Sequence, residues 1–162
     1  GQSMAPQEAV PEWARVDPRP KLRGCRILVV DADEAVRTQA HNLLERYGAV
    51  VETAHDGAEA VYMVRGLNRP FFYDAIISDV RLPNMTGYDL LLKLKELIEP
   101  VPMILMTGYG YDPGHSIVKA RQAGLPQGAV LYKPFRLDQL IETVEKIIEF
   151  TAKSSSAPGE AS

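Results

Sequence analysis

The sequence predicts a doubly wound α/β domain, in which a parallel sheet carries helices on both faces. Short apolar runs alternate with segments of helical periodicity five times along the chain. The runs are mostly continuous, which is typical of strands buried on both faces of a parallel sheet. Glycines and prolines separate the segments, so each strand is followed by one helix.

The five βα units lie between residues 23 and 150, which we take as one domain. The expected strands cover residues 27–30, 50–54, 75–79, 103–106 and 129–132. The expected helices cover residues 36–47, 57–64, 90–98, 116–123 and 137–148, where apolar side chains recur at helical spacing. The strand at 50–54 is shorter and more polar than the others, which favours an edge position.

The two ends of the chain differ in composition from this domain. Residues 1–22 read as the remnant of an expression tag followed by a proline-rich linker, because their prolines interrupt any helix. Residues 151–162 are small and polar, which predicts a disordered tail.

Composition excludes several classes of function. A net charge of -3 and the absence of a basic stripe argue against a nucleic-acid partner. No apolar run approaches the ~20 residues of a membrane span, so we expect no membrane contact. The single Cys25 cannot form an internal disulfide, and the three histidines are scattered, so no zinc site is expected. These features favour a cytoplasmic location.

Four strands end in polar side chains that carry chemistry: Asp31, Asp79, Thr107 and Lys133. The carboxyl ends of parallel strands share one edge of a sheet, where open α/β folds bind ligands. A single acid there could simply end a strand. Two acids, a hydroxyl and an ammonium together suit phosphoryl transfer, in which a divalent cation and a fixed positive charge offset the negative charge of both partners.

Four segments, ILVVDADEAVR, SDVRLPNMTGYDLL, MILMTG and LYKPF, occur in order and at suitable spacing. With them the chain resembles a response-regulator receiver domain, the phosphoacceptor module of two-component signalling, over residues 25–150. The resemblance implies a flavodoxin-like (βα)5 fold with a five-stranded parallel sheet in the order 2-1-3-4-5.

The resemblance also implies a role for each residue at the predicted edge. Asp79 matches the aspartate that accepts a phosphoryl group from a histidine kinase or a histidine phosphotransfer domain. Thr107 matches the hydroxyl that turns toward that group, and Lys133 matches the lysine that pairs with it, with a cis bond to the following proline. The Mg²⁺ ligands would be Asp31, Asp79 and the backbone carbonyl of Arg81.

One position departs from the family pattern. The second acid of the usual pair is Ala32 here. Asp33 follows it and either caps the first helix or supplies its carboxylate or carbonyl to the metal site. We therefore expect Mg²⁺ to bind more weakly than is usual for the family. The alternative is a pseudo-receiver, an interaction module that is not phosphorylated.

The implied function is a switch. Phosphorylation of Asp79 would change the face formed by residues 116–123, 129–132 and 137–148, which binds a downstream protein or the chain's own kinase core. We expect no enzyme activity on a free metabolite, although the domain would assist its own phosphoryl transfer and autodephosphorylation.

The origin of the chain has two readings. The segment KLRGCRILVVDADE, which leads into the domain, resembles the linker into the C-terminal receiver of a hybrid sensor histidine kinase. The alternative is a stand-alone regulator. A flavin-binding protein of similar topology is disfavoured, because the acidic DADE after the first strand repels phosphate in the absence of a metal.

Overall fold

Five parallel strands form one sheet in the computed structural model, which describes residues 22–66, 73–108 and 115–155. The strands are β1 (Arg26–Val30), β2 (Val50–Ala54), β3 (Ala75–Asp79), β6 (Met103–Gly108) and β7 (Val130–Lys133). Their order is β2-β1-β3-β6-β7. Since β4 and β5 lie outside this sheet, the order is the expected 2-1-3-4-5, with the polar β2 at an edge, and the predicted fold is confirmed.

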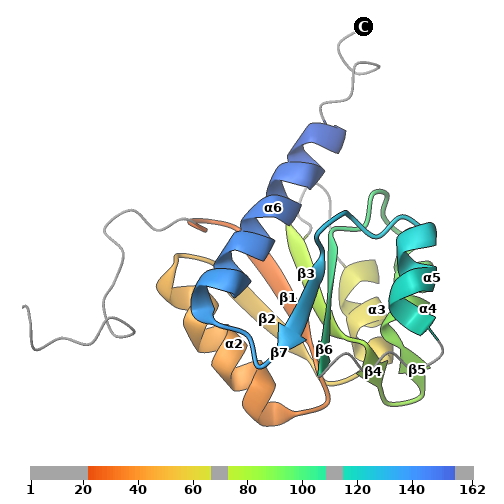
Figure 1. Ribbon diagram of the computed structural model, residues 1–162, viewed down its shortest axis with the longest axis horizontal. Coiled ribbons are helices and arrows are strands. Elements are labelled where there is room, and N and C mark those ends of the chain that lie inside the picture. The colour runs from red at the N-terminus through yellow and green to blue at the C-terminus, as the bar shows by residue number, and fades with distance from the viewer. Residues whose placement is uncertain (1–21, 67–72, 109–114, 156–162) are drawn as a thin grey trace, which may run out of the picture.

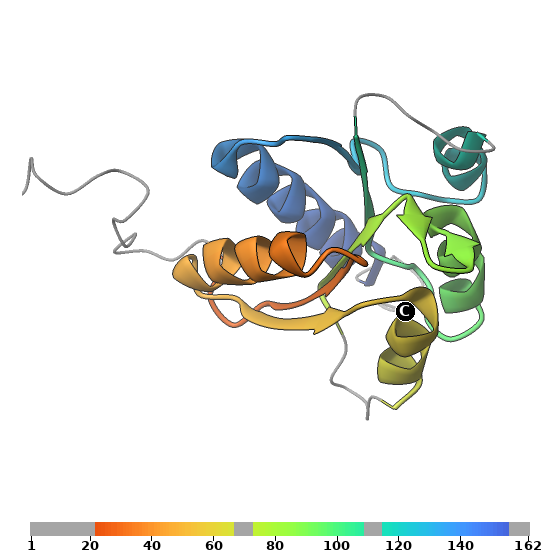
Figure 2. The same cartoon turned by 90° about the horizontal axis from the view of Figure 1, so that it is seen from below.

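Helices cover both faces of the sheet. They are α2 (Glu34–Arg46), α3 (Gly57–Arg65), α4 (Gly87–Lys95), α5 (Ser116–Gln122) and α6 (Leu137–Ser155). Figure 1 and the turned view in Figure 2 place α2 and α6 on one face and α3, α4 and α5 on the other. Among the described residues, none of the helices is both long enough and apolar enough to cross a membrane.

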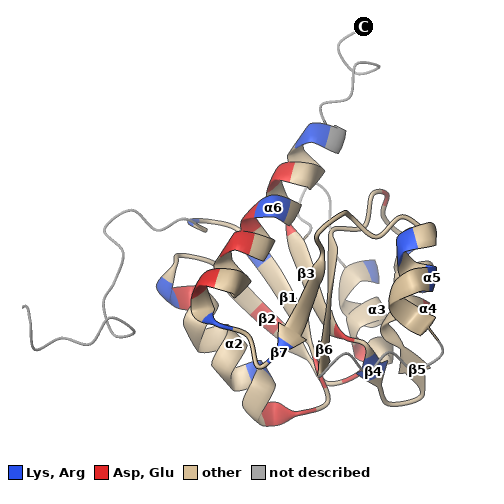
Figure 3. Ribbon diagram, in the orientation of Figure 1, with Lys and Arg blue, Asp and Glu red and all other residues tan. Residues whose placement is uncertain are grey.

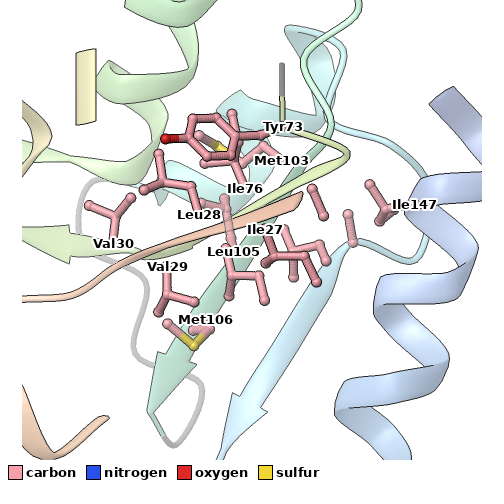
Figure 4. Close-up of a cluster of buried hydrophobic side chains, with 14 of the residues drawn as sticks. Ile27, Leu28, Val29, Val30, Tyr73, Ile76, Met103, Leu105, Met106 and Ile147 are labelled. Atoms are coloured by element: carbon pink, nitrogen blue, oxygen red, sulfur yellow. The ribbon is translucent and has the colours of Figure 1, made fainter. Parts of the chain in front are cut away.

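The core explains why the strands read as continuous apolar runs. Residues 27–30 of β1 and residues 75–77 of β3 are 0% exposed, because helices pack against both sides of the central strands. Figure 4 shows Leu28, Ile76 and Met103 together in this cluster. Burying a large apolar side chain contributes roughly 1.5–3 kcal/mol to the stability of the folded protein. In the central strands β1 and β3, polar residues therefore lie only toward the strand ends.

Side-chain caps begin three of the helices close to those strand ends. Each cap residue accepts a backbone N–H of the first helical turn: Asp33 from Ala35 at 2.9 Å, Asp56 from Glu59 at 2.8 Å, and Thr86 from Asp89 at 3.0 Å. In α4 the Asp89 carboxylate also accepts the Thr86 N–H, which completes a capping box. The caps fix where the chain leaves the sheet edge.

A small hairpin follows β3 and was not predicted. Strand β4 (Arg81–Leu82) pairs antiparallel with β5 (Met85–Thr86). Asn84 turns the chain with φ 67°, a left-handed conformation that asparagine tolerates. The sequence indicated only a break at Pro83 and Gly87, because two-residue strands are too short to show a period.

The structure extends beyond the predicted domain boundaries at both ends. The Leu22 side chain is 0% exposed, and its N–H donates to the Tyr47 carbonyl at 2.8 Å. Helix α6 continues through Ser155, past residue 150, where the tail was expected to begin. Its polar Thr151 is tolerated because the hydroxyl donates to the Ile147 carbonyl at 3.0 Å. The rest of the predicted linker and tail lies outside the described residues.

Candidate functional site

The strand register brings the carboxyl ends of the inner strands level with one another. The aligned pairs are Val30 with Ser78, Asp79 with Met106, and Gly108 with Lys133. Figure 3 shows acidic residues at this lower end of the sheet. The predicted site residues occupy or directly follow these aligned positions, so they lie along one edge of the sheet.

Asp79 is the last residue of β3, and its side chain is 20% exposed. One carboxylate oxygen, Oδ1, accepts the Arg81 N–H at 3.2 Å. The other, Oδ2, lies 3.2 Å from the Lys133 Nζ. Asp79 is thus held at both oxygens and is still reached by solvent, as a group that reacts with an incoming donor must be.

Asp31 directly follows β1 and is only 1% exposed. Its Oδ1 accepts the Asp33 N–H at 2.8 Å, and its Oδ2 lies 3.0 Å from the Lys133 Nζ. Burial raises the pKa of the Asp31 carboxyl above its ordinary value, and the nearby Asp79 charge adds to this rise. The Asp33 N–H and the Lys133 ammonium partly offset the shift in pKa.

Lys133 ends β7 and bridges the two carboxylates with one ammonium group. Burial by itself would lower the pKa of Lys133. The hydrogen bonds and charges of Asp31 and Asp79 outweigh burial, so the net shift in pKa is upward. The lysine therefore stays charged at neutral pH. Its peptide bond to Pro134 is cis, as the resemblance implied.

Thr107 is 2% exposed and lies near the end of β6. It follows Met106, which is aligned with Asp79 of β3, and it precedes Gly108, which is aligned with Lys133 of β7. The hydroxyl-bearing residue thus occupies the strand position between the phosphoacceptor candidate and the lysine. All four residues predicted at this edge are there.

Asp33 and Arg81 border the site. The Asp33 carboxylate caps α2, which confirms the capping interpretation, and Ala32 beside it is exposed and offers no oxygen from its side chain. A contribution of Asp33 to a metal site stays a prediction. The Arg81 side chain is exposed, so only its backbone remains of interest for a metal.

The donor set can be compared with what Mg²⁺ requires. Within residues 22–66, 73–108 and 115–155, no three His, Cys, Asp or Glu side chains form a group that could hold a metal ion. Two carboxylates, Asp31 and Asp79, and nearby backbone carbonyls are present. Mg²⁺ prefers oxygen ligands and is often held by only one or two carboxylates with several waters. The residues therefore fit Mg²⁺, with one acid fewer than the family pattern supplies.

Arg37 was missed by the sequence analysis. Its Nη1 donates to the Asp31 backbone carbonyl at 2.6 Å from the first turn of α2. An arginine on an otherwise exposed helix surface gives no signal of this role, because the bond depends on how the loop 31–33 turns.

A cavity of about 320 Å³ opens beside the lysine, between α2 and the start of α6. Its lining residues are Val36, Gln39, Lys133, Pro134 and Phe135. Of the site residues, it is Lys133 that borders this cavity.

Comparison with known proteins agrees with this geometry. Residues 27–145 match the response regulator receiver domain family. The response regulator MprA of Mycobacterium bovis (strain BCG / Pasteur 1173P2) is 35% identical over 134 residues, which make up 82% of this chain and 54% of that protein. The chain thus spans about half the length of the curated relatives it matches.

Solved structures show the same likeness. Full-length FixJ from B. japonicum is 30% identical, with a TM-score of 0.70 over 82% of this chain and 62% of that one. The beryllofluoride-activated NtrC4 receiver domain dimer is 29% identical, with a TM-score of 0.67 over 77% of this chain and 97% of that one. By sequence, sheet order and strand-end residues, the chain belongs to the response regulator receiver domains of two-component signalling.

Proposed function

We propose that Asp79 accepts a phosphoryl group from a histidine kinase or a histidine phosphotransfer domain. The observation that carries the proposal is the Lys133 ammonium, bound to Asp31 at 3.0 Å and to Asp79 at 3.2 Å. It places a fixed positive charge between a buried acid and a solvent-accessible one. Receiver domains interact with such kinases as a family.

In the transfer step an Asp79 carboxylate oxygen attacks phosphorus. The oxygen–phosphorus bond forms while the phosphorus–nitrogen bond of the donor histidine breaks, and the imidazole leaves with the electron pair of that bond. Lys133 would offset the charge that gathers on the phosphoryl oxygens, and the Thr107 hydroxyl would donate to one of them. In hydrolysis water attacks phosphorus, the bond between phosphorus and the Asp79 oxygen breaks, and inorganic phosphate leaves as the carboxylate is restored.

Mg²⁺ would be held by Asp31, Asp79 and the backbone carbonyl of Arg81. When bound, it neutralises charge between the carboxylates and the phosphoryl oxygens. Because Ala32 provides no carboxylate, binding would be weaker than with a full acidic pair. Asp33 is already engaged as the cap of α2, so it compensates for Ala32 only at the expense of that cap.

The phosphorylated site would act on the face formed by α5, β7 and α6. Phosphorylation adds charge and acceptor oxygens beside Lys133 at the end of β7. Tyr132, 53% exposed, and Val118, 49% exposed, lie on β7 and α5. A downstream protein or the chain's own kinase core would bind there, and the domain itself would act on no free metabolite.

The test is to incubate the protein with Mg²⁺ and acetyl phosphate, or with a phosphorylated histidine kinase, and to measure intact mass. We expect the mass of one phosphoryl group to be added. Asp79→Asn should abolish the adduct. Asp138→Asn is the matched control, because the Asp138 side chain is 62% exposed on α6 and pairs with Arg136 rather than with Lys133.

The pseudo-receiver alternative predicts the opposite result. Absence of an adduct from both donors, in a folded wild-type protein, would rule out the phosphoacceptor role. The chain would then act through an unmodified surface alone.

A further inference from the structure

Asp31 has all four of its polar groups hydrogen-bonded. Its N–H donates to Ala54 at 3.1 Å, its carboxylate accepts from Asp33 at 2.8 Å and from Lys133 at 3.0 Å, and its carbonyl accepts from Arg37 at 2.6 Å. Such complete satisfaction is expected of a residue that is 1% exposed. The bonds differ in what they fix.

Two of these bonds cannot hold the loop 31–33 in place. The Asp33 N–H and the Asp31 carboxylate belong to the same loop and would move together. The Lys133 ammonium sits on a flexible stem and can follow a displaced carboxylate. The two hydrogen bonds to the Asp31 main chain come from ordered elements: Ala54, at the end of β2, and Arg37, on α2.

The anchors act on opposite sides of the Asp31 side chain. Ala54 fixes the peptide before Asp31, and Arg37 fixes the peptide after it. The second peptide leads to Ala32, whose exposed methyl group gives the loop no further support. The direction of the Asp31 carboxylate therefore depends on the carbonyl that Arg37 holds.

The guanidinium is well suited to this task. Arg37 is half-buried, and in the described part of the chain it forms no ion pair with an acid. A charged donor makes a shorter and stronger hydrogen bond to a carbonyl than a neutral one. The backbone N–H of Arg37 also bonds to the Asp33 carbonyl at 3.1 Å, so the residue is fixed relative to the loop it holds.

We propose that Arg37 is a positioning residue of the phosphorylation site. It holds the main chain at Asp31, and through it aims the Asp31 carboxylate at Lys133 and toward Mg²⁺. The consequence for metal binding and phosphorylation rests on the proposed function. The consequence for the loop itself does not.

The first experiment measures the loop. Arg37→Met keeps the aliphatic stem and removes the guanidinium, whereas Arg37→Lys keeps a charged donor. We expect hydrogen exchange at the Asp33 amide, followed by NMR, to be about tenfold faster in Arg37→Met, with the global unfolding midpoint nearly unchanged. Arg65→Met is the matched control, because Arg65 is exposed at the end of α3, outside the face proposed for partner binding. If Arg37→Met fails to fold, Arg37→Gln replaces it.

The second experiment measures the site by calorimetric titration of Mg²⁺. Loss of a group that orients a metal ligand typically weakens binding 10- to 100-fold. We expect about tenfold weaker binding in Arg37→Met, substantial recovery in Arg37→Lys and no change in Arg65→Met. Slower labelling of Asp79 by acetyl phosphate at limiting Mg²⁺ should accompany the loss.

Three outcomes are decisive. Wild-type behaviour of Arg37→Met in both experiments would overturn the proposal. Faster amide exchange with unaltered Mg²⁺ affinity and labelling would also overturn it, since Arg37 would then only stabilise the loop. If the wild-type protein takes neither Mg²⁺ nor phosphoryl, the proposed function fails, and amide exchange alone decides whether Arg37 positions Asp31.

Discussion

The two carboxylates of the site differ in how much water reaches them. The Asp31 side chain is 2% exposed and the Asp79 side chain 20%, although both bind the same lysine. The buried acid suits a fixed role as a metal ligand, and the accessible one suits attack on a donor. Strand-end position alone does not distinguish them, because both follow apolar runs in the sequence.

Ala32 is the residue whose replacement should change the site most simply. We expect Ala32→Asp to tighten Mg²⁺ binding on the order of tenfold, because affinity for hard cations rises with the number of charged oxygen ligands. Titration calorimetry measures the change. Asp33→Ala is the comparison: it should cost ~1 kcal/mol of stability through loss of the α2 cap and leave Mg²⁺ affinity as it is. A large loss of affinity in Asp33→Ala would instead make Asp33 a ligand.

Glu52 gives the molecule a pH dependence away from the site. The hydrogen bond from the buried Tyr73 hydroxyl is the largest cause of a lowered Glu52 pKa, and Arg26 at 3.0 Å adds to it. A carboxylate with a lowered pKa stabilises the folded protein at pH values above the ordinary glutamate pKa of about 4.5. That stabilisation is lost as the pH falls through the pKa that Glu52 has in the folded protein.

We therefore expect Glu52→Gln to reduce the free energy of unfolding more at pH 7 than at pH 3, as measured by urea denaturation at each pH. In a Tyr73→Phe background, the effect of Glu52→Gln should differ less between pH 7 and pH 3, because the hydrogen-bond donor to Glu52 is gone. If the difference in free energy of unfolding between wild type and Glu52→Gln were the same at pH 3 and pH 7, the lowered pKa of Glu52 would be contradicted.

Helix α4 begins against the backbone of the proposed phosphoacceptor. A Cβ at Gly87, the first residue of α4, would lie 2.6 Å from Leu105 Cδ2 and 3.0 Å from the Asp79 carbonyl oxygen. A larger residue at this position would have to displace the Leu105 side chain and press on the Asp79 backbone, so glycine is strongly favoured here. In the sequence Gly87 indicates only a break between a strand and a helix, since a packing contact with another strand leaves no local pattern.

We expect Gly87→Ala to destabilise the protein by about 1–3 kcal/mol through overpacking, measured by urea denaturation. Labelling of Asp79 should slow as well, because the displaced carbonyl belongs to the same residue. Gly66→Ala is the matched control: among the described residues, the nearest atom to its Cβ would be the Tyr62 carbonyl oxygen at 3.4 Å, so stability should hold or rise by about 0.4–1 kcal/mol. Equal stability of the two variants would refute the packing argument.

On the scale of the whole molecule, the site joins strands that are distant in sequence. Asp31 and Lys133 are 102 positions apart in the chain. Their ion pair connects the end of β1 with the end of β7, across β3 and β6. A phosphoryl group or an analogue at Asp79 would add contacts to the same edge. Anything that binds only the folded state stabilises it by mass action.

We expect beryllofluoride with Mg²⁺ to raise the thermal unfolding midpoint, by the equivalent of ~2.7 kcal/mol at a hundred times its Kd. Differential scanning calorimetry measures the shift. Asp79→Asn should show none, and Asp138→Asn should behave as wild type. A shift retained in Asp79→Asn would place the binding elsewhere.

The sequence by itself determined the sheet, its order of elements and the edge on which Asp31, Asp79, Thr107 and Lys133 meet. Continuous apolar runs and helical spacing specify the elements, and parallel strands bring their carboxyl ends to one side. Tertiary structure decided what those residues touch. The bridging position of Lys133, the bond from Arg37 and the fit of Gly87 depend on register and side-chain rotamers, and no local pattern encodes contacts between segments so far apart in the chain.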